Sequence, residues 1–381
     1  MAIAIAFDGL MLSQKKVGIG NYIFNLSMAL AKLEPPGVSV DVFLQGDAAG
    51  MLAGYERPGF RVVPVPAMGN RRRFAYALLR SAKLYGKRYD LVHFPDYLLP
   101  FRRTGAKVVV TLPDLSFRKH REFLTIGRYA PKRLLYPLAI RRADAIITYS
   151  ESTRKDLQAA YGNALGSKTI SSIPLGVSPV FLDPAAQSED KLAEVRERYG
   201  LTAPFFLFVG TIEPRKNLLG ILQAFQGIRA TVPHRFVVVG ARGWRYDQVF
   251  TFLQESGIAD AVSFLDYVPD VDLPAIYRLA SFLAYPSFYE GFGLPIVEAF
   301  AAGVPVLTSR TSSMIEVGGD AAHYVDPSSL EDLRAGLLAL CVREEYRRAL
   351  VARGRQRVGR FSWDACAAET VRVYQRVLNA S

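Results

Sequence analysis

The sequence has few of the residues that build metal centres and disulfide frameworks. Among 381 residues there are two cysteines, Cys341 and Cys366, and four scattered histidines. The cysteines have no metal-ligand spacing, so we expect neither a zinc site nor a disulfide scaffold. No apolar run approaches the roughly 18 residues of a membrane-spanning helix, and no basic stretch precedes the first apolar run as it would in a signal peptide. These absences predict a reduced, cytoplasmic, metal-free and soluble protein.

Acidic charge is scarce in the first half of the chain. Residues 1–180 hold 26 of the 47 Lys and Arg residues but 12 of the 35 Asp and Glu residues, so the excess of positive charge lies there. The basic residues cluster at 71–73, 102–103, 118–121 and 141–142. Without a helix-turn-helix, RNP or zinc-finger pattern, nucleic acid is the weakest of three explanations. An anionic membrane surface and a merely solvated basic face both stay open.

Short apolar runs alternate with segments of helical periodicity, which predicts an α/β protein with parallel sheets. A Pro-, Ser- and Gly-rich stretch, "SSIPLGVSPVFLDPAAQSED", separates two sets of candidate strands and predicts a linker. We therefore expect two doubly wound, Rossmann-like domains, 1–180 and 181–362, that face each other across a cleft. Ligands of such sheets bind at the carboxyl ends of the strands. The last segment, 363–381, has helical periodicity.

A strand-to-helix turn near the N-terminus could approach a ligand. In "KKVGIGNYIFNLSMAL", Gly18 and Gly20 allow a close approach of the backbone where a helix begins near Asn21. The pattern falls short of a full dinucleotide fingerprint, because Ile23 holds the place of the third glycine. Taken alone, the motif is better explained by an ordinary strand-to-helix turn without a ligand.

A second turn carries two adjacent cations. In "FFLFVGTIEPRKNLLGILQAF", a strand ends at Gly210, and Arg215 and Lys216 precede an amphipathic helix. Two cations at a helix N-terminus suit a diphosphate, with Lys as a point charge and Arg as a fork. The alternative is a pair of solvated loop residues beside Glu213.

A third turn holds two carboxylates. In "SFYEGFGLPIVEAFAAGVPV", Glu290 lies on a glycine-rich loop and Glu298 lies one turn inside the following helix, which Pro295 suits as its first residue. The amides of residues 292–294 would then be open to an anionic or hydroxyl-rich ligand. Carboxylates accept hydrogen bonds from sugar hydroxyls. The alternative has Glu290 solvated and Glu298 capping the helix.

A pair of aspartates, Asp270 and Asp272 in "PDVDLP", has an Asp-x-Asp form that can hold a divalent ion on a diphosphate. Because it precedes a helix expected at Leu273, N-capping is the better account.

Together, "VGTIEPRKNL", "PSFYEGFGLPIVEAFAAGVPV" and "EVGGDAAHYVDP" resemble the retaining, GT-B-fold enzymes of glycosyltransferase family 4. The resemblance extends over essentially the whole chain. It implies a domain 1–180 that binds the acceptor, a domain 181–362 that binds a nucleotide sugar, and a C-terminal helix, 363–381, that crosses back to the first domain. No metal or other cofactor is implied, because cations and helix N-termini neutralise the phosphates.

The resemblance also implies roles for residues at matching positions. Glu290 would contact the donor sugar, Glu298 the ribose, and Lys216 with Arg215 the diphosphate. The remaining residues implied for the donor site are Gly18, Gly20, Gly210, Thr211, Tyr267, Val268, Phe292, Gly293 and Leu294.

Two positions depart from the family pattern. Thr211 stands where many relatives have an arginine, a role that Arg215 could take. Pro113 stands before Asp114 where many relatives read His-Asp, and His120 is not an obvious replacement. Asp114 remains a candidate catalytic residue. Either the donor is a 6-deoxy sugar, or Pro113 reshapes the pocket while the phosphate side carries the chemistry.

We therefore expect transfer of a hexose or 6-deoxyhexose with retention, from a nucleotide-diphosphate sugar to a glycan or lipid-linked acceptor, in surface polysaccharide synthesis of the O-antigen type. GDP-linked mannose or rhamnose is favoured. The basic N-terminal domain would rest on the inner face of a bacterial cytoplasmic membrane. The alternatives are a nucleotide-sugar epimerase on the same fold and a non-catalytic, basic membrane-binding protein.

Overall fold

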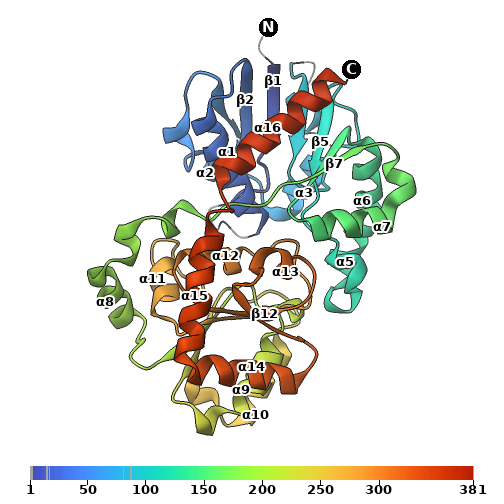
Figure 1. Ribbon diagram of the computed structural model, residues 1–381. Coiled ribbons are helices and arrows are strands. Elements are labelled where there is room, and N and C mark those ends of the chain that lie inside the picture. Colours follow the sequence, from blue (N-terminus) through green and yellow to red (C-terminus); the bar gives the residue numbers. More distant parts are fainter. Residues whose placement is uncertain (1–2, 14–15, 17, 80, 86–87, 381) are drawn as a thin grey trace. The chain divides into compact units, whose positions relative to one another are not determined.

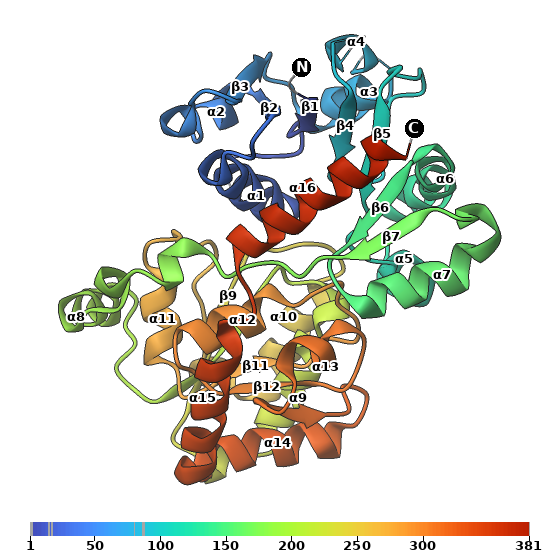
Figure 2. The same cartoon turned by 45° about the horizontal axis from the view of Figure 1, so that its top comes forward.

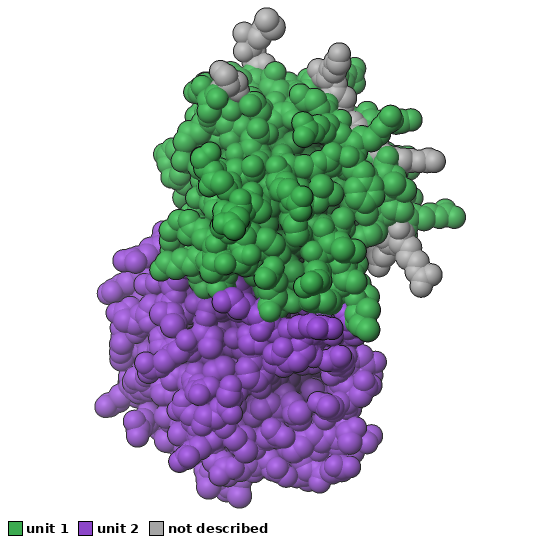
Figure 3. All heavy atoms as spheres, turned by 90° about the vertical axis from the view of Figure 1, so that its right-hand side faces the viewer, with its two compact units in different colours: residues 1–118, 126–176, 362–381 green, residues 119–125, 177–361 purple. Residues whose placement is uncertain are grey.

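The computed structural model describes residues 3–13, 16, 18–79, 81–85 and 88–380, without the side chains of residues 47, 70, 71 and 82. The chain forms two compact units, drawn in two colours in Figure 3. Unit 1 comprises residues 1–118, 126–176 and 362–381, and unit 2 comprises residues 119–125 and 177–361. The chain thus passes between the units at 176/177 and 361/362, and a short segment of its first half, residues 119–125, belongs to unit 2.

Unit 1 is built on a parallel sheet of seven strands in the order β3-β2-β1-β4-β5-β6-β7, whose labels can be followed in Figure 2. Each strand pairs in parallel with its neighbours. The strands are β1 (Ile3–Asp8), β2 (Val38–Gln45), β3 (Phe60–Val65), β4 (Leu91–Phe94), β5 (Lys107–Thr111), β6 (Ala145–Thr148) and β7 (Thr169–Ser172).

Helices cover both faces of this sheet. They are α1 (Ile19–Leu33), α2 (Gly46–Ala49), α3 (Asn70–Leu79), α4 (Ala82–Tyr85), α5 (Ser116–Lys119), α6 (Ile126–Arg142), α7 (Glu151–Leu165) and α16 (Trp363–Asn379). Because side chains alternate along a strand, His93 and Phe94 of β4 point to opposite faces. His93 meets Tyr374 of α16, whereas Phe94 packs edge-on against Tyr85 of α4. Helices α1 and α16 lie side by side (Figures 1 and 2).

Unit 2 is built on a parallel sheet of six strands in the order β10-β9-β8-β11-β12-β13. The strands are β8 (Phe205–Val209), β9 (Arg235–Val239), β10 (Val262–Phe264), β11 (Leu283–Tyr285), β12 (Val306–Ser309) and β13 (Ala322–Val325). In its core Phe206 stacks between Phe236 and Phe282 at ring-centroid distances of 4.5 and 5.2 Å. Such continuous apolar strands are typical of parallel sheets that are buried on both faces.

The helices of unit 2 are α8 (Glu189–Arg198), α9 (Leu218–Gln226), α10 (Asp247–Ser256), α11 (Leu273–Leu279), α12 (Leu294–Ala301), α13 (Ser313–Gly318), α14 (Leu330–Val342) and α15 (Glu344–Val358). Single 3₁₀ turns occur at η1 (Ala53–Tyr55) and η2 (Arg121–Phe123), then at η3 (Pro179–Phe181), η4 (Pro184–Gln187), η5 (Pro214–Lys216), η6 (Arg229–Thr231) and η7 (Ala259–Ala261). The segment 119–125 is held here by Trp244, whose Nε1 donates to the carbonyl of Phe123 at 2.7 Å.

The predicted class, two doubly wound parallel sheets, is confirmed, and the stretch predicted as a linker contains the passage from unit 1 to unit 2 at 176/177. Residues 171–190 include the end of β7, the turns η3 and η4 and the start of α8, so the stretch is largely ordered. The sequence analysis also missed β7 and β13. No helix within the described ranges combines the length and the apolar composition needed to cross a bilayer. Ser381, the last residue of the predicted C-terminal helix, lies outside the described residues.

Candidate functional site

The candidate site of unit 2 lies where three neighbouring strands end. Strands β8, β11 and β12 are adjacent and parallel, so the loops that follow them meet at one edge of the sheet. The first loop carries Arg215 and Lys216, the second carries Glu290, and the third carries Ser312 and Ser313. The carboxyl edge of a parallel sheet is the usual place for ligands in α/β proteins.

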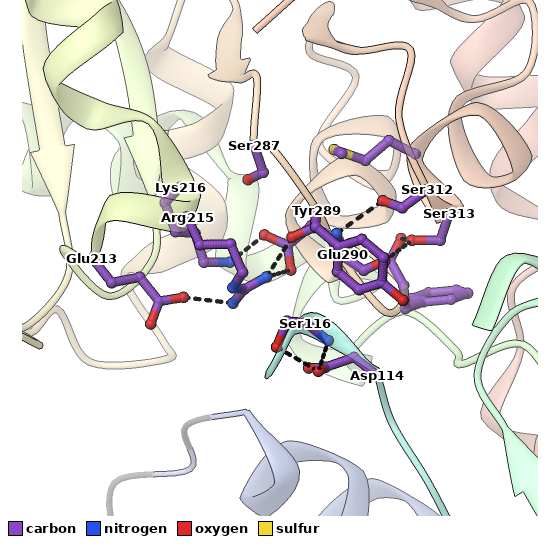
Figure 4. A network of polar contacts seen from close by, with 12 residues as sticks. Asp114, Ser116, Glu213, Arg215, Lys216, Ser287, Tyr289, Glu290, Ser312 and Ser313 are labelled. Atoms are coloured by element: carbon purple, nitrogen blue, oxygen red, sulfur yellow. Dashed lines mark hydrogen bonds and ion pairs between the residues drawn. The ribbon is translucent and has the colours of Figure 1, made fainter. Parts of the chain in front are cut away.

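Glu290 is the centre of this cluster (Figure 4). Its Oε2 lies 2.6 Å from Nη1 of Arg215, and its Oε1 lies 2.8 Å from Nζ of Lys216. The hydroxyl of Tyr285 donates to the same Oε1 at 2.7 Å. On its other side Arg215 donates through Nη2 to Glu213 at 2.5 Å. Two carboxylates and two cations therefore form one nearly neutral network.

Burial makes this network strong. The side chain of Glu290 is 9% exposed, and those of Arg215 and Lys216 are 17% and 12% exposed. Burial alone would raise the pKa of Glu290, but Arg215 and Lys216 outweigh it and hold the pKa at about 2. Glu290 is thus an anion at any physiological pH, and the alternative of a solvated Glu290 beside solvated cations is wrong.

Lys216 lies directly over Gly210. A Cβ atom at Gly210 would come 3.3 Å from Cδ and Cε of Lys216, and the backbone there has φ +147°. The ammonium group donates to Glu290 and to the hydroxyl of Tyr285, which uses two of its three N–H groups. Within the described residues, one N–H of Lys216 therefore stays available to a ligand. Thr211, next in sequence, is half-buried.

The loop after Glu290 presents free backbone donors. The N–H groups of Phe292, Gly293 and Leu294 have no acceptor within the described part of the chain. Ser313 fixes the loop by donating to the carbonyls of Glu290 and Phe292 at 2.8 and 2.9 Å. Because these amides precede and begin α12, they suit an anion or a hydroxyl-rich ligand. Pro295 is the second residue of this helix and not the first.

Glu298 lies inside α12 and is not a helix cap. Its side chain is buried, and its Oε2 accepts a hydrogen bond from the hydroxyl of Tyr277 at 2.8 Å. Burial raises its pKa to about 7, with a further rise from Asp270. A group near neutrality can accept hydrogen bonds from ligand hydroxyls and change its protonation on binding. Of the two residues predicted for the base pocket, Tyr267 is 44% exposed and Val268 is buried.

The remaining candidates belong to unit 1. Gly18 caps α1 in the left-handed region, at φ +56°, while Gly20 lies within the helix, which begins at Ile19 and not at Asn21. The carboxylate of Asp114 accepts hydrogen bonds from the amide and the hydroxyl of Ser116, at 2.9 and 2.6 Å. Asp114 therefore forms an Asx turn with Ser116, the first residue of the short helix α5.

Unit 1 also has acidic groups that the sequence analysis missed. Asp8 ends β1, and Asp96 follows β4. Burial raises the pKa of Asp8 to about 6 and that of Asp96 to about 7, the latter with help from the nearby Asp114 and Asp8. The signal for Asp96 was its place directly after an apolar strand, in "VHFPDYLLP".

The capping role predicted for Asp272 is wrong. Its side chain forms no capping hydrogen bond and instead pairs with Lys191 at 2.7 Å and Arg198 at 2.6 Å, both on α8. An aspartate with two cationic partners does not suit a metal. Among the described residues, no group of three or more His, Cys, Asp or Glu side chains is placed to hold a metal ion.

Comparison with known proteins identifies the family. Residues 17–181 match the profile of Glycosyltransferase Family 4, and residues 193–357 match that of Glycosyl transferases group 1. O-antigen chain mannosyltransferase B of Escherichia coli is 33% identical over 313 residues, which cover 80% of this chain and 77% of that protein. The chain belongs to glycosyltransferase family 4. As the resemblance implied, it is a retaining glycosyltransferase.

Other relatives of this glycosyltransferase are more distant or much longer. The serotype-specific mannosyltransferase WbdA of Escherichia coli is 27% identical over 245 residues. These residues cover 63% of this chain but only 30% of that protein. Anabaena Alr3699/HepE, solved in complex with UDP and glucose, is 18% identical with a TM-score of 0.71 over 97% of this chain and 99% of that one. This likeness confirms the GT-B fold.

The glycosyltransferase site contains residues that its motifs did not reveal. Tyr277 and Tyr285 hold the two glutamates, and Ser312 accepts a hydrogen bond from the amide of Glu290 at 2.9 Å. The tyrosines lie in an apolar helix and an apolar strand, where an aromatic residue is normally part of the core. The serines could have been found, because they follow β12, whose end meets the same edge of the sheet.

Proposed function

We propose that this glycosyltransferase transfers mannose from a GDP-linked donor to a glycan or lipid-linked glycan acceptor, in surface polysaccharide assembly of the O-antigen type. The observation that carries the proposal is the 33% identity to an O-antigen chain mannosyltransferase over 80% of the chain. The buried cluster around Glu290 supplies the charges that such a donor requires.

The donor fits unit 2 as follows. Lys216, with its remaining N–H, and Arg215 bind the diphosphate, aided by the free amides of residues 292–294. Glu290, fixed on both oxygens, orients the sugar. Glu298 accepts hydrogen bonds from the ribose, and the segment from Tyr267 to Val268 borders the base. Gly210 leaves room for Lys216, and Thr211 lies beside it. Gly18 and Gly20 contribute backbone from unit 1.

The chemistry that follows is electrostatic. The bond between the anomeric carbon and the phosphate oxygen breaks, and its electron pair goes to the nucleoside diphosphate. Lys216 and the amides stabilise the charge that develops there, in the manner of an oxyanion site. The acceptor oxygen bonds to the anomeric carbon on the same face of the sugar and its proton passes to the departing phosphate oxygen, so the configuration is retained.

The acceptor would bind to unit 1. The carboxyl edge of its sheet carries Asp8, Asp96 and Asp114, which can accept hydrogen bonds from sugar hydroxyls. Because Asp8 already accepts hydrogen bonds from the amide of Leu10 and the hydroxyl of Tyr85, Asp96 and Asp114 are the better candidates.

One observation favours a second donor. Pro113 cannot donate a hydrogen bond, and the family usually has a histidine there that contacts the sugar near its 6-hydroxyl. A 6-deoxy sugar such as rhamnose has no 6-hydroxyl to satisfy. If GDP-mannose turns over faster than GDP-rhamnose, this second donor is excluded.

Attachment to the inner face of a membrane is also part of the proposal. On α6, Ile126 and Leu134 are 80% and 72% exposed, among the basic residues Arg128, Lys132 and Arg133. An amphipathic, basic surface of this kind binds anionic lipid. We expect binding to vesicles with phosphatidylglycerol that weakens with added salt and in the variant Ile126→Ser/Leu134→Ser. Binding that salt leaves unchanged would contradict this part.

The decisive experiment is a thermal-shift titration with GDP, UDP, dTDP and ADP, followed by turnover of the matching nucleotide sugars. A nucleotide at 100 times its dissociation constant adds about 2.7 kcal/mol of stability. The shift should occur with GDP and be lost in Lys216→Met but kept in Lys155→Met, an exposed site in unit 1. No shift with any nucleotide would refute the donor site. Sugar release or epimerisation without an acceptor would favour the epimerase.

A further inference from the structure

A second pocket lies in unit 1, at the edge of the sheet opposite the carboxyl ends of its strands. Strands β4 to β7 are adjacent and parallel, so their starts lie together. Asp90 directly precedes β4, Lys107 begins β5, Asp144 precedes β6 and Lys168 precedes β7. All four residues line one hollow of about 730 Å³, within the usual size of small-molecule sites.

The pocket is strongly basic. Its floor includes the apolar side chains of Phe94, Leu99 and Leu378. Six basic residues line it, against the two aspartates: Arg102, Arg103, Lys107, Arg141, Arg142 and Lys168. The fold thus joins two basic clusters that lie far apart in the sequence, at 102–103 and 141–142.

The two aspartates offset only part of this positive charge. Asp90 accepts a hydrogen bond from the amide of Ala4 at 2.8 Å, and Asp144 accepts one from the amide of Val108 at 2.7 Å. Asp144 also lies 3.7 Å from Nζ of Lys107. Both carboxylates are therefore already engaged at the strand starts.

Most of the cations have no anionic partner. Arg142 donates to the carbonyls of Pro100 and Phe101. Burial and the positive charge of Arg103 lower its pKa. The other four without a carboxylate partner among the described residues are Arg102, Arg103, Arg141 and Lys168. Unpaired like charges around one hollow repel each other, and a bound anion would remove that repulsion.

A buried hydroxyl lies in the wall of the pocket. Thr104 lines the pocket and is 8% exposed, and its Oγ1 is enclosed without a hydrogen-bond partner in the described structure. Buried hydroxyls are nearly always paired, and a rotation of this side chain toward the hollow would give it a ligand oxygen as acceptor.

We propose that this pocket binds a phosphate-bearing anion. Guanidinium groups hold phosphate oxygens in pairs and ammonium groups add point charge, which is the combination present here. The ligand is either a free phosphorylated molecule or the headgroup of an anionic lipid. Phe101, 49% exposed beside Arg102, could enter the apolar layer in the second case. The inference does not depend on the donor site of unit 2.

The test compares two variants that lose the same charge. Arg103→Gln/Lys168→Gln alters the pocket, and Arg72→Gln/Lys155→Gln removes an exposed arginine and an exposed lysine elsewhere in unit 1. Pyrophosphate binding is measured by calorimetry. Since one lost hydrogen bond to a charged group corresponds to about a tenfold loss of affinity, the pocket variant should bind about a hundredfold more weakly than the control variant.

Any pyrophosphate bound in unit 2 contributes equally to both variants. An equal loss of pyrophosphate affinity in the two variants would mean general electrostatic attraction and would contradict binding of pyrophosphate in the pocket.

A second arm identifies the source of the phosphate. Vesicles of phosphatidylcholine with and without phosphatidylglycerol are sedimented with each variant. If the pocket variant loses pyrophosphate binding but keeps vesicle binding, the ligand is a free phosphorylated molecule. If it loses vesicle binding selectively, the ligand is a lipid headgroup. If neither probe distinguishes the variants, the proposal is wrong. Thermal shift by the donor nucleotide should persist in both variants, which separates this result from failure of the donor site.

Discussion

Replacing Glu298 with Gln should make the protein more stable above neutral pH while it damages the function. The carboxyl group is buried in α12, and within the described part of the chain the hydroxyl of Tyr277 is the one side-chain group that donates to it. Burial raises its pKa from the ordinary 4.5 to about 7. Gln can still accept the hydrogen bond from Tyr277, but it carries no charge to bury.

The size of the effect follows from the pKa difference. The folded protein holds the proton of Glu298 up to about pH 7, whereas the unfolded chain releases it near pH 4.5. The contribution of Glu298 to the free energy of unfolding is therefore fully present below pH 4.5. It falls as the pH rises through this window, because the unfolded state then binds fewer protons than the folded state. At about 1.4 kcal/mol per pKa unit, the loss is about 3 kcal/mol at alkaline pH.

The assay is thermal unfolding of wild type and Glu298→Gln at about pH 5 and about pH 8, where a difference of about 3 kcal/mol corresponds to roughly 6–12 °C in a domain of this size. Asp8 and Asp96 titrate in the same range, but they affect both proteins equally. Glu255→Gln, at an exposed position of α10, is the matched control and should show no pH-dependent difference. An equal difference between wild type and Glu298→Gln at both pH values would refute the reasoning.

Four further outcomes are expected. Lys216→Met should lower kcat/KM about a hundredfold or more, and a loss as small as that of Lys155→Met would contradict its role. Glu290→Gln should lower the free energy of unfolding by about 3 kcal/mol near pH 7 but by little near pH 2. The depressed pKa of Glu290 stabilises the folded protein above pH 4.5, and that stabilisation is lost as the pH falls toward 2. Gly210→Ala should lower the melting temperature through backbone strain at positive φ, and it should lower turnover by displacing the side chain of Lys216. Unchanged turnover would exclude a role for the contact between Gly210 and Lys216. Turnover should survive EDTA, and loss that Mg²⁺ restores would implicate a metal.

Much of the fold could be predicted from the sequence, because parallel strands buried on both faces are continuous apolar runs bounded by turn residues. Strand β7, "TISS", has no such run, since its residues are half-buried or exposed at the edge of the sheet. Strand β13, "AHYV", is also an edge strand with two half-buried residues. Both were missed because edge strands need fewer apolar residues than central ones.

The site could be predicted as far as local spacing determines it. Glu290, Arg215 and Lys216 were found from two separate loops, but their direct pairing depends on the order of β8, β11 and β12, which no local pattern encodes. Asp272 was misinterpreted for the same reason. Its partners Lys191 and Arg198 lie on a helix about 75 residues earlier, and a long-range ion pair competes with the local capping role.

The return of α16 to unit 1 has a consequence for synthesis of the chain. The strands of unit 1 are made before unit 2, but unit 1 is completed by α16, when Tyr374 reaches His93 at 2.7 Å and Trp363 packs against Gly176. The continuous part of unit 2, residues 177–361, leaves the ribosome before that helix does. Folding in order of synthesis is therefore interrupted, and the buried face of unit 1 stays open until α16 has been made. A chain stopped at Phe361 should be cut by protease within unit 1 and spared within unit 2.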